Sequence, residues 1–167
     1  MSTYKVIDNF LPEDIFAQLE QSIVWNNEFS WTLIHKVTFE EPENNDFQSL
    51  YFSHLGYFGD IPLTGLHQMC YELCKAIGDY RALIRLKANF YPYTPDIYEH
   101  CRHIDFPYEH KGALLSLNTC NGFTRLEDGT KIESVRNRML FFDPSKTHNS
   151  STTNNQKGRF NIQINYF

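Results

Sequence analysis

Three residues in the last third of the chain could hold a metal ion: His103, Asp105 and His148. Two imidazoles and one carboxylate suit an octahedral iron(II) site, because they cover one face of the metal and leave the other open for substrate and oxygen. His103 and Asp105 are two residues apart, so on an extended strand both side chains emerge on the same face. The sequence therefore predicts an iron centre for oxygen chemistry at these residues.

Arg159 follows His148 by eleven residues, beyond a turn-like stretch that contains Asn154, Asn155 and Gly158. A chain that reverses at this turn could bring Arg159 and His148 to the same mouth. A guanidinium offers two parallel N–H donors to a carboxylate and stays charged when it is partly desolvated. The arginine therefore indicates a ligand with a carboxylate group beside the metal.

Two stretches around these residues alternate between apolar and polar side chains, as strands with two different faces do. The apolar faces hold Ile84, Leu86, Ala88 and Phe90 in one stretch and Phe160, Ile162, Ile164 and Tyr166 in the other; the polar faces hold Arg85, Lys87, Asn89 and Tyr91, and Arg159, Asn161, Gln163 and Asn165. The polar faces could meet solvent, or they could line a cavity while the apolar faces pack under helices. The strand pattern leaves both open, and the place of Arg159 on a polar face favours the cavity.

The rest of the chain must supply the elements that support these strands. We expect a strand at residues 4–10, a helix after Pro12, strands at 31–38 and 47–54, a second helix from Pro62 to Gly78, and short strands at intervals of roughly ten residues from Leu83 onward. Residues 40–46 form an acidic loop, which we interpret as a solvated connection rather than a substrate lid. This order predicts a sheet sandwich or barrel with helices on one side.

Composition limits the class of protein. With 167 residues, 41% of them hydrophobic and 16% aromatic, the chain suits one domain with a core. The net charge of −5 argues against a broad nucleic-acid surface, which would need a local track of Arg81, Arg85 and Lys87. We find no signal peptide or membrane span and expect a cytoplasmic protein. Cys70 and Cys74 have no second ligand pair, so we expect reduced thiols rather than a zinc site.

Taken together, His103-x-Asp105, His148 and Arg159 resemble the motifs of the iron(II)/2-oxoglutarate-dependent oxygenases. The resemblance is closest to their small prolyl-4-hydroxylase-like and phage-type members. It also rests on three further stretches, at residues 87–91 (Lys-Ala-Asn-Phe-Tyr), 117–124 (Leu-Asn-Thr-Cys-Asn-Gly-Phe-Thr) and 137–143, the strand before the second histidine. It covers residues 83–167 strongly and the N-terminal strand and helix weakly.

The resemblance implies a mainly β protein with flanking helices. Its fold would be a double-stranded β-helix, of the jelly-roll or cupin-like kind, with the N-terminal helices packed on the outer face of one sheet. Residues 1–167 would form a single oxygenase domain. Within it, residues 1–82 would provide N-terminal strands and supporting helices, and residues 83–167 the catalytic β-helix core.

The resemblance also implies roles for individual residues. His103, Asp105 and His148 would be the catalytic iron ligands, and Arg159 would bind the distal carboxylate of 2-oxoglutarate. Tyr91 would be a second contact to this co-substrate.

Asn89 and Asn161 would also belong to the co-substrate site. Their Asn-x-Tyr and Arg-x-Asn settings resemble those of the nucleic-acid-demethylating branch, although their spacing to the metal motif differs here. His100 and His110 flank the motif, but neither has a carboxylate two residues on. We therefore expect them at the pocket rim or on the surface.

The reaction implied by the resemblance uses Fe(II), 2-oxoglutarate and O2. It hydroxylates an unactivated C–H bond of a prolyl, other peptide or small-molecule substrate and releases succinate and CO2. An alternative is a non-catalytic cupin-like binding module or a viral structural module, because the same barrels serve both purposes. A pure binding module has no chemical reason to hold all four motif residues, and this set distinguishes the two hypotheses.

Overall fold

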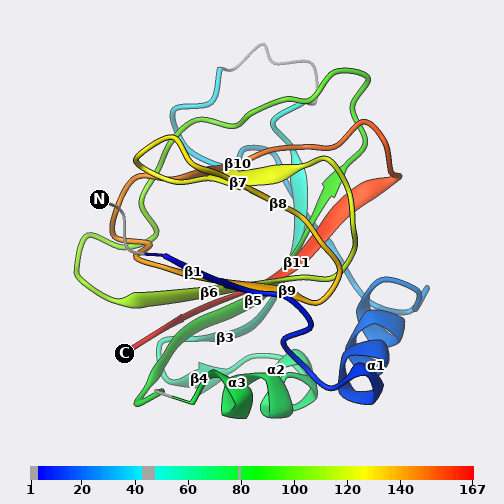
Figure 1. The fold of residues 1–167 in the computed structure, drawn as a ribbon, viewed down its shortest axis with the longest axis vertical. Coiled ribbons are helices and arrows are strands. Elements are labelled where there is room, and N and C mark those ends of the chain that lie inside the picture. Colours follow the sequence, from blue (N-terminus) through cyan, green and yellow to red (C-terminus); the bar gives the residue numbers. More distant parts are fainter. Residues whose placement is uncertain (1–3, 43–47, 79) are drawn as a thin grey trace.

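The structure is a computed structural model that describes residues 4–42, 48–78 and 80–167. Two antiparallel sheets lie one above the other, and the helices lie under the larger sheet (Figure 1). The larger sheet contains, in order, β1 (Lys5–Ile7), β9 (Arg138–Phe142), β6 (Lys111–Ser116), β11 (Gly158–Tyr166), β5 (Leu83–Pro92), β3 (Tyr51–Phe58) and β2 (Thr32–Ile34), with β4 (Ile61–Pro62) paired to β3. The smaller sheet contains β10 (Asn149–Ser150), β7 (Phe123–Arg125) and β8 (Lys131–Glu133). The helices are α1 (Glu13–Ile23), α2 (Leu66–Met69) and α3 (Tyr71–Ile77).

The segment between β5 and β6 adds a further edge to the smaller sheet. It does so through isolated bridges that pair Tyr93 with Thr153, Glu99 with Ser151, and His103 with His148. Apart from the β7–β8 pair, successive strands of the second half thus alternate between the two sheets, which is the arrangement of a double-stranded β-helix. The predicted fold class is confirmed, including the helices on the outer face of one sheet.

The pairing of β5 with β11 decides which side chains face the interior. Four polar pairs lie opposite one another in this register: Arg159 with Tyr91, Asn161 with Asn89, Gln163 with Lys87, and Asn165 with Arg85. Because side chains alternate along a strand, these pairs share one face, and that face is turned toward the smaller sheet. The expectation that the polar faces line a cavity therefore holds.

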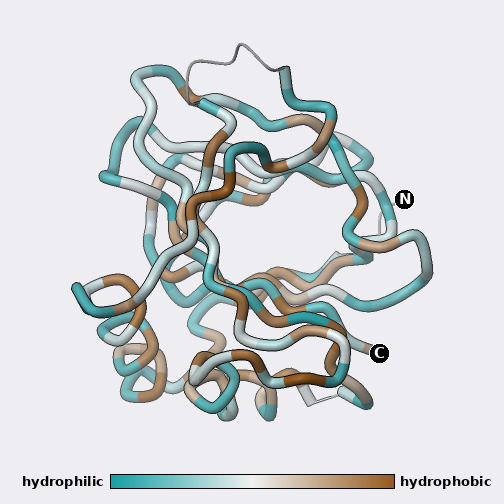
Figure 2. Tube along the Cα trace, turned by 180° about the vertical axis from the view of Figure 1, so that it is seen from behind, coloured by the Kyte–Doolittle hydropathy of each residue, from teal (hydrophilic) through white to brown (hydrophobic). Residues whose placement is uncertain are grey.

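The opposite face of the larger sheet builds the core with the helices. Ile162 and Leu86 are fully buried there, in one cluster with Phe16, Leu19 and Ile23 of α1 and Leu66 of α2. Each large apolar side chain buried in this layer contributes about 1.5–3 kcal/mol relative to exposure. In Figure 2, hydrophobic segments recur along the helices and the strands that cover them. Phe90 shares this face but stacks on Phe160, with ring centroids 4.5 Å apart, rather than under a helix.

The N-terminal half differs from the expectation in its details. Of residues 31–38 only β2 is a strand, and the strand expected at 47–54 lies later, as β3. The second helix is interrupted at Cys70, which separates α2 from α3, and it ends as predicted at Gly78, where φ is 82°. All four cysteines are free thiols. No helix in the described ranges is long and apolar enough to cross a membrane.

The acidic loop is not simply a solvated connection. Its residue Glu41 is 2% exposed and accepts hydrogen bonds from the Tyr98 hydroxyl and the Cys101 backbone N–H, both at 2.7 Å. The loop is therefore tied to the segment that carries His103 and Asp105. Residues 43–46, the remainder of the predicted loop, lie outside the described residues.

Asn137 links the N-terminal segment to the β-helix core. It has a positive φ of 60°, and its buried side chain accepts a hydrogen bond from the Leu11 N–H at 3.0 Å and donates one to the Leu11 carbonyl at 2.8 Å. Asn137→Ala removes both bonds. The left-handed backbone conformation at this position then keeps its steric cost, with no side-chain hydrogen bond to offset it. We expect the substitution to lower the free energy of unfolding by about 2–4 kcal/mol.

Urea denaturation can measure this effect. Asn137→Gly is a matched control, because it also loses both bonds but adopts a positive φ without steric cost, and it should show a smaller loss than alanine. Equal stability of wild type and Asn137→Ala would mean that the two bonds contribute nothing net.

Candidate metal centre

His103 and His148 are direct cross-strand neighbours, although 45 residues of sequence separate them. The backbone N–H of each donates to the carbonyl of the other at 2.9 Å, which closes an antiparallel bridge. In such a pair both side chains emerge on the same side of the sheet. Their ring centroids lie 4.6 Å apart, so the fold by itself places two imidazoles side by side.

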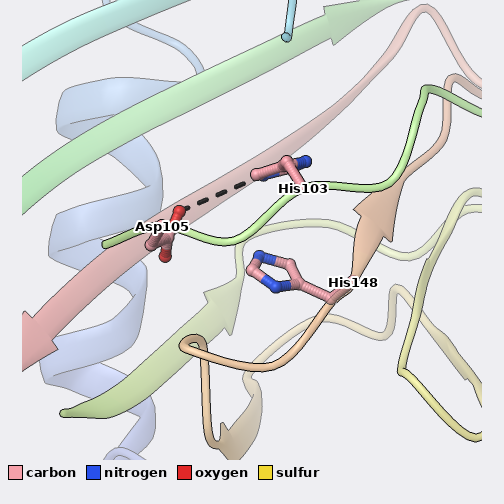
Figure 3. A group of neighbouring side chains, drawn as sticks. All are labelled: His103, Asp105 and His148. Atoms are coloured by element: carbon pink, nitrogen blue, oxygen red, sulfur yellow. Dashed lines mark ion pairs between the residues drawn. The ribbon is translucent and has the colours of Figure 1, made fainter. Parts of the chain in front are cut away.

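Asp105 completes the group. The three side chains point toward a common centre (Figure 3), and one ligand atom from each lies within 4.8 Å of the others. The distance between the His103 Nε2 and the Asp105 carboxylate is 4.0 Å. Within the described ranges, this is the one group of three or more histidine, cysteine, aspartate or glutamate side chains that could hold a metal ion.

Hydrogen bonds to the backbone orient both rings. The Nδ1 of His148 lies 3.0 Å from the Lys146 carbonyl, and the Nδ1 of His103 lies 3.4 Å from the Cys101 carbonyl. A ring nitrogen bonded to a carbonyl must carry the proton, which leaves the Nε2 lone pair for a metal. Burial lowers the pKa of both imidazoles, to about 4 for His103. Both rings are therefore neutral near pH 7, the form that binds metal.

The Asp105 carboxylate is held by one ion pair and two hydrogen bonds from β5 and β11. Arg85 approaches one of its oxygens at 2.8 Å, while Gln163 and Asn165 donate to the other at 2.6 and 2.8 Å. Burial alone would raise the pKa of Asp105, but the neighbouring Arg85 guanidinium holds it well below its usual range. The carboxylate is thus ionised and fixed in orientation, as a metal ligand requires.

Arg159 lies in the same small, mostly enclosed cavity as His103 and His148. It is 1% exposed and donates to the Thr124 hydroxyl at 2.7 Å and to the Ser151 carbonyl at 3.3 Å. Its Nε has no partner, and no carboxylate of the described residues forms an ion pair with it. A buried charge without a counter-ion is costly, so the site is incomplete without an anion.

The other residues expected at a co-substrate site surround Arg159. Tyr91 is 6% exposed, with its ring centroid 5.5 Å from the guanidinium carbon. Asn89 and Asn161 are each 1% exposed, and the side-chain amide N–H of Asn89 donates to the side-chain oxygen of Asn161 at 2.9 Å. This leaves the Asn161 amide N–H2 without a partner among the described residues, and Asn161 lines the cavity. The structure brings all these residues together. Asn89 is the only one of them that does not line the cavity.

The prediction for His100 and His110 is wrong. Both are buried, at 2% and 7% exposure, rather than on the rim or surface. His100 lies against Tyr91, with ring centroids 5.4 Å apart, and His110 contacts Asn165 at 3.2 Å through its Nε2. The absence of a nearby carboxylate argued correctly against a place in the metal group, but it carried no information about burial.

Sequence reasoning assigned no role to several residues of the site. Arg85, Gln163 and Asn165 hold Asp105, Thr124 contacts Arg159, and Lys87 and Tyr51 line the cavity. The sequence pattern could have pointed to four of these six, because Arg85, Lys87, Gln163 and Asn165 lie on the same alternating polar faces as Asn89 and Arg159. Arg85 and Lys87 face the interior, so they do not form a local basic surface track with Arg81.

Comparison with known proteins shows where this fold recurs. No protein-family model matches the sequence, and no curated protein matches it significantly. Among solved structures, a prolyl-4-hydroxylase from Pseudomonas putida is 17% identical, with 99% of this chain and 93% of that chain covered and a TM-score of 0.63. A prolyl hydroxylase from Trichoplax adhaerens, solved with a peptide fragment of a hypoxia inducible factor, is 16% identical, with 100% and 84% covered and a TM-score of 0.61. The non-heme alpha-ketoglutarate-dependent epimerase SnoN is 11% identical, with 99% and 78% covered and a TM-score of 0.68. At these identities the likeness establishes a shared fold.

Proposed function

We propose that this protein is an iron(II)- and 2-oxoglutarate-dependent oxygenase that hydroxylates an unactivated C–H bond. The observation that carries the proposal is a His/Asp/His group whose two histidines line the same cavity as a buried arginine, which has no counter-ion among the described residues. A metal site alone would suit many functions. A buried guanidinium beside it calls for a carboxylate ligand, which is what 2-oxoglutarate provides.

Each part of the chain then has a defined task. His103, Asp105 and His148 would hold the iron, and their hydrogen bonds to backbone carbonyls and to Arg85, Gln163 and Asn165 fix the ligand atoms before the metal arrives. When bound, iron and 2-oxoglutarate supply the oxygen chemistry, with release of succinate and CO2.

Arg159 and Tyr91 would anchor the distal carboxylate, and Asn161 offers a free amide N–H to the same ligand. The two sheets enclose these groups, which keeps bulk water from the reacting centre. Because low dielectric strengthens interactions between charges, an anion bound at Arg159 is held more firmly here than at the surface.

We infer a peptide substrate with a prolyl residue as the first class to examine. Two of the similar structures are prolyl hydroxylases, and one of them is solved with a peptide fragment. The similar epimerase indicates that this fold also accepts other chemistry on small molecules. Succinate formation from 2-oxoglutarate, measured with proline-containing peptides and with the same peptides carrying alanine at that position, separates these possibilities.

Ligand-dependent stabilisation tests the proposed function without knowledge of the substrate. With Mn²⁺ present, 2-oxoglutarate at a hundred times its dissociation constant should stabilise the protein by about 2.7 kcal/mol, which raises the melting temperature by several degrees. Glutarate lacks the keto group and cannot chelate a metal, so it is the matched control and should stabilise less. No shift with 2-oxoglutarate would favour the alternative, a non-catalytic cupin-like binding module.

A further inference from the structure

Lys87 is a second cation in the cavity, and the function proposed above gives it no task. It lines the cavity together with Arg159, His103 and His148. Its Nζ lies 5.6 Å from the ring centroid of Tyr51, which also lines the cavity. No carboxylate of the described residues forms an ion pair with this ammonium, although its charge acts on all three members of the metal group.

The charges of the site do not balance. Arg85, Lys87 and Arg159 are cations, whereas Asp105 is the one carboxylate among the residues that form the cavity and hold the metal group. Arg85 is already paired with Asp105 at 2.8 Å. Arg159, and Lys87 in its protonated form, therefore remain without a carboxylate partner among the described residues, and a divalent metal would add to the excess of positive charge.

The two cations stand at different depths of the same cavity. Lys87 pairs with Gln163, and Arg159 pairs with Tyr91, so the two levels are four residues apart along β5 and β11. At about 3.3 Å per residue this is roughly 13 Å between backbone positions, which two long side chains can bridge from opposite ends. The backbone of Lys87 lies at the metal end, because Gln163 directly opposite it donates to Asp105 at 2.6 Å. Its side chain extends along the cavity over Tyr51, and its charge still acts on all three metal-group residues.

Burial has a further effect on Lys87. Desolvation and repulsion by Arg85 lower its pKa to about 7, although Asp105 acts in the opposite direction, so near pH 7 the side chain is only partly charged without an anion. An ammonium in this state gains most from an anion, because a bound carboxylate restores the charged form and supplies the missing partner. No surface lysine would show this behaviour, since water already stabilises its charge.

We propose that Lys87 binds a second carboxylate group at the metal end of the cavity, separate from the one held by Arg159. This inference rests on the proposed function, because it takes the cavity to be the site of a carboxylate ligand beside a metal. The carboxylate has two possible sources. It is either the 1-carboxylate of 2-oxoglutarate, next to the metal, or a carboxylate on the primary substrate, in which case the enzyme selects acidic substrates.

Two titrations on the Mn²⁺-loaded protein identify the source. In the first, 2-oxoglutarate is titrated into wild type, Lys87→Met and the control Lys75→Met, whose lysine side chain on α3 is 66% exposed. Loss of one charge-assisted hydrogen bond should weaken binding about tenfold to a hundredfold in Lys87→Met, with no change in the control. That result assigns Lys87 to the 1-carboxylate of the co-substrate.

In the second titration, butyrate and butyramide are added to the complex with Mn²⁺ and 2-oxoglutarate. The probes differ in charge but little in shape, and paramagnetic Mn²⁺ broadens the proton resonances of any probe that binds close to it. Broadening of butyrate alone, in wild type and Lys75→Met but not in Lys87→Met, assigns Lys87 to a carboxylate of the primary substrate.

The outcomes separate this inference from the function on which it rests. Unchanged 2-oxoglutarate affinity in Lys87→Met, together with equal broadening by butyrate and butyramide, overturns the role of Lys87 and leaves the oxygenase proposal intact. Failure of wild type itself to bind 2-oxoglutarate overturns both. Methionine is one heavy atom shorter than lysine and carries no charge, so in this partly buried position Lys87→Met should melt no lower than wild type. If it does, Lys87→Gln keeps a polar side chain without the charge, and the same two titrations decide.

Discussion

Replacement of Arg159 by alanine is expected to weaken 2-oxoglutarate binding on the order of a hundredfold to several thousandfold. Removing one member of a buried ion pair typically costs about 3–5 kcal/mol, because the other charge loses its partner, and each 1.4 kcal/mol corresponds to about a factor of ten. Arg159 meets the condition for this large value, since it is 1% exposed. Lysine should restore only part of the loss, because a point charge cannot reproduce two parallel donors.

Metal and co-substrate titrations should respond differently to this change. Arg159 contacts Thr124 and Ser151 and touches none of the three metal-group residues in the structure. Metal affinity measured without 2-oxoglutarate should therefore stay near the wild-type value in Arg159→Ala. Arg81→Ala is a suitable control, because Arg81 is exposed just before β5 and lies outside the cavity. Unchanged 2-oxoglutarate affinity in Arg159→Ala would show that Arg159 is an ordinary strand residue and that the co-substrate assignment is wrong.

Loss of any one of the three metal-group residues is expected to abolish metal-dependent succinate formation. Loss of an outer partner of a metal ligand typically costs 10–100-fold in affinity or activity, and loss of a direct ligand should cost more. His103→Ala and His148→Ala should fold normally, because each removes a neutral ring rather than a charge. Calorimetric titration with Mn²⁺ and a succinate assay on the same preparations measure both effects.

The aspartate needs a gentler substitution than alanine. Asp105→Ala leaves Arg85 without its partner and Gln163 and Asn165 without their acceptor, so it also destabilises the fold. Asp105→Asn keeps the shape and a carbonyl oxygen for one of these donors, and it isolates the loss of the anionic ligand. His67→Ala is a suitable control, because His67 lies on α2, outside the metal group. Full activity in any of the metal-group variants would remove that residue from the ligand set.

Much of the fold can be predicted from local pattern in the sequence. The alternation in residues 84–91 and 159–166 identifies two strands with one polar and one apolar face, and Arg159 on a polar face indicates that this face is turned inward. The His-x-Asp spacing places two side chains on the same side of one strand, whatever surrounds it. These inferences succeed because period-two alternation depends only on the backbone of a single strand.

Other features depend on contacts between distant segments. The pairing of His103 with His148, and of β5 with β11, exists only once the chain has folded back on itself, so no local pattern reports it. The same holds for the burial of His100, which contacts Ser150 and Tyr91 from other strands. It also holds for the hydrogen bonds that Glu41 accepts from Tyr98 and Cys101. The break at Cys70 likewise lies inside a stretch whose apolar spacing predicts one continuous helix.

The sequence by itself determined the ligand types, their order and the strands that carry them. The tertiary structure decided which charges share one enclosed space. Arg85 and Lys87 are equivalent as sequence, two residues apart on one polar face, yet Arg85 is paired with Asp105 and Lys87 is left without a carboxylate. That difference arises because the segment between β5 and β6 brings Asp105 next to Arg85, a contact that exists only in the folded chain. A charge is compensated only by groups near it in space, and proximity in space is what the sheet register and the closure of the β-helix supply.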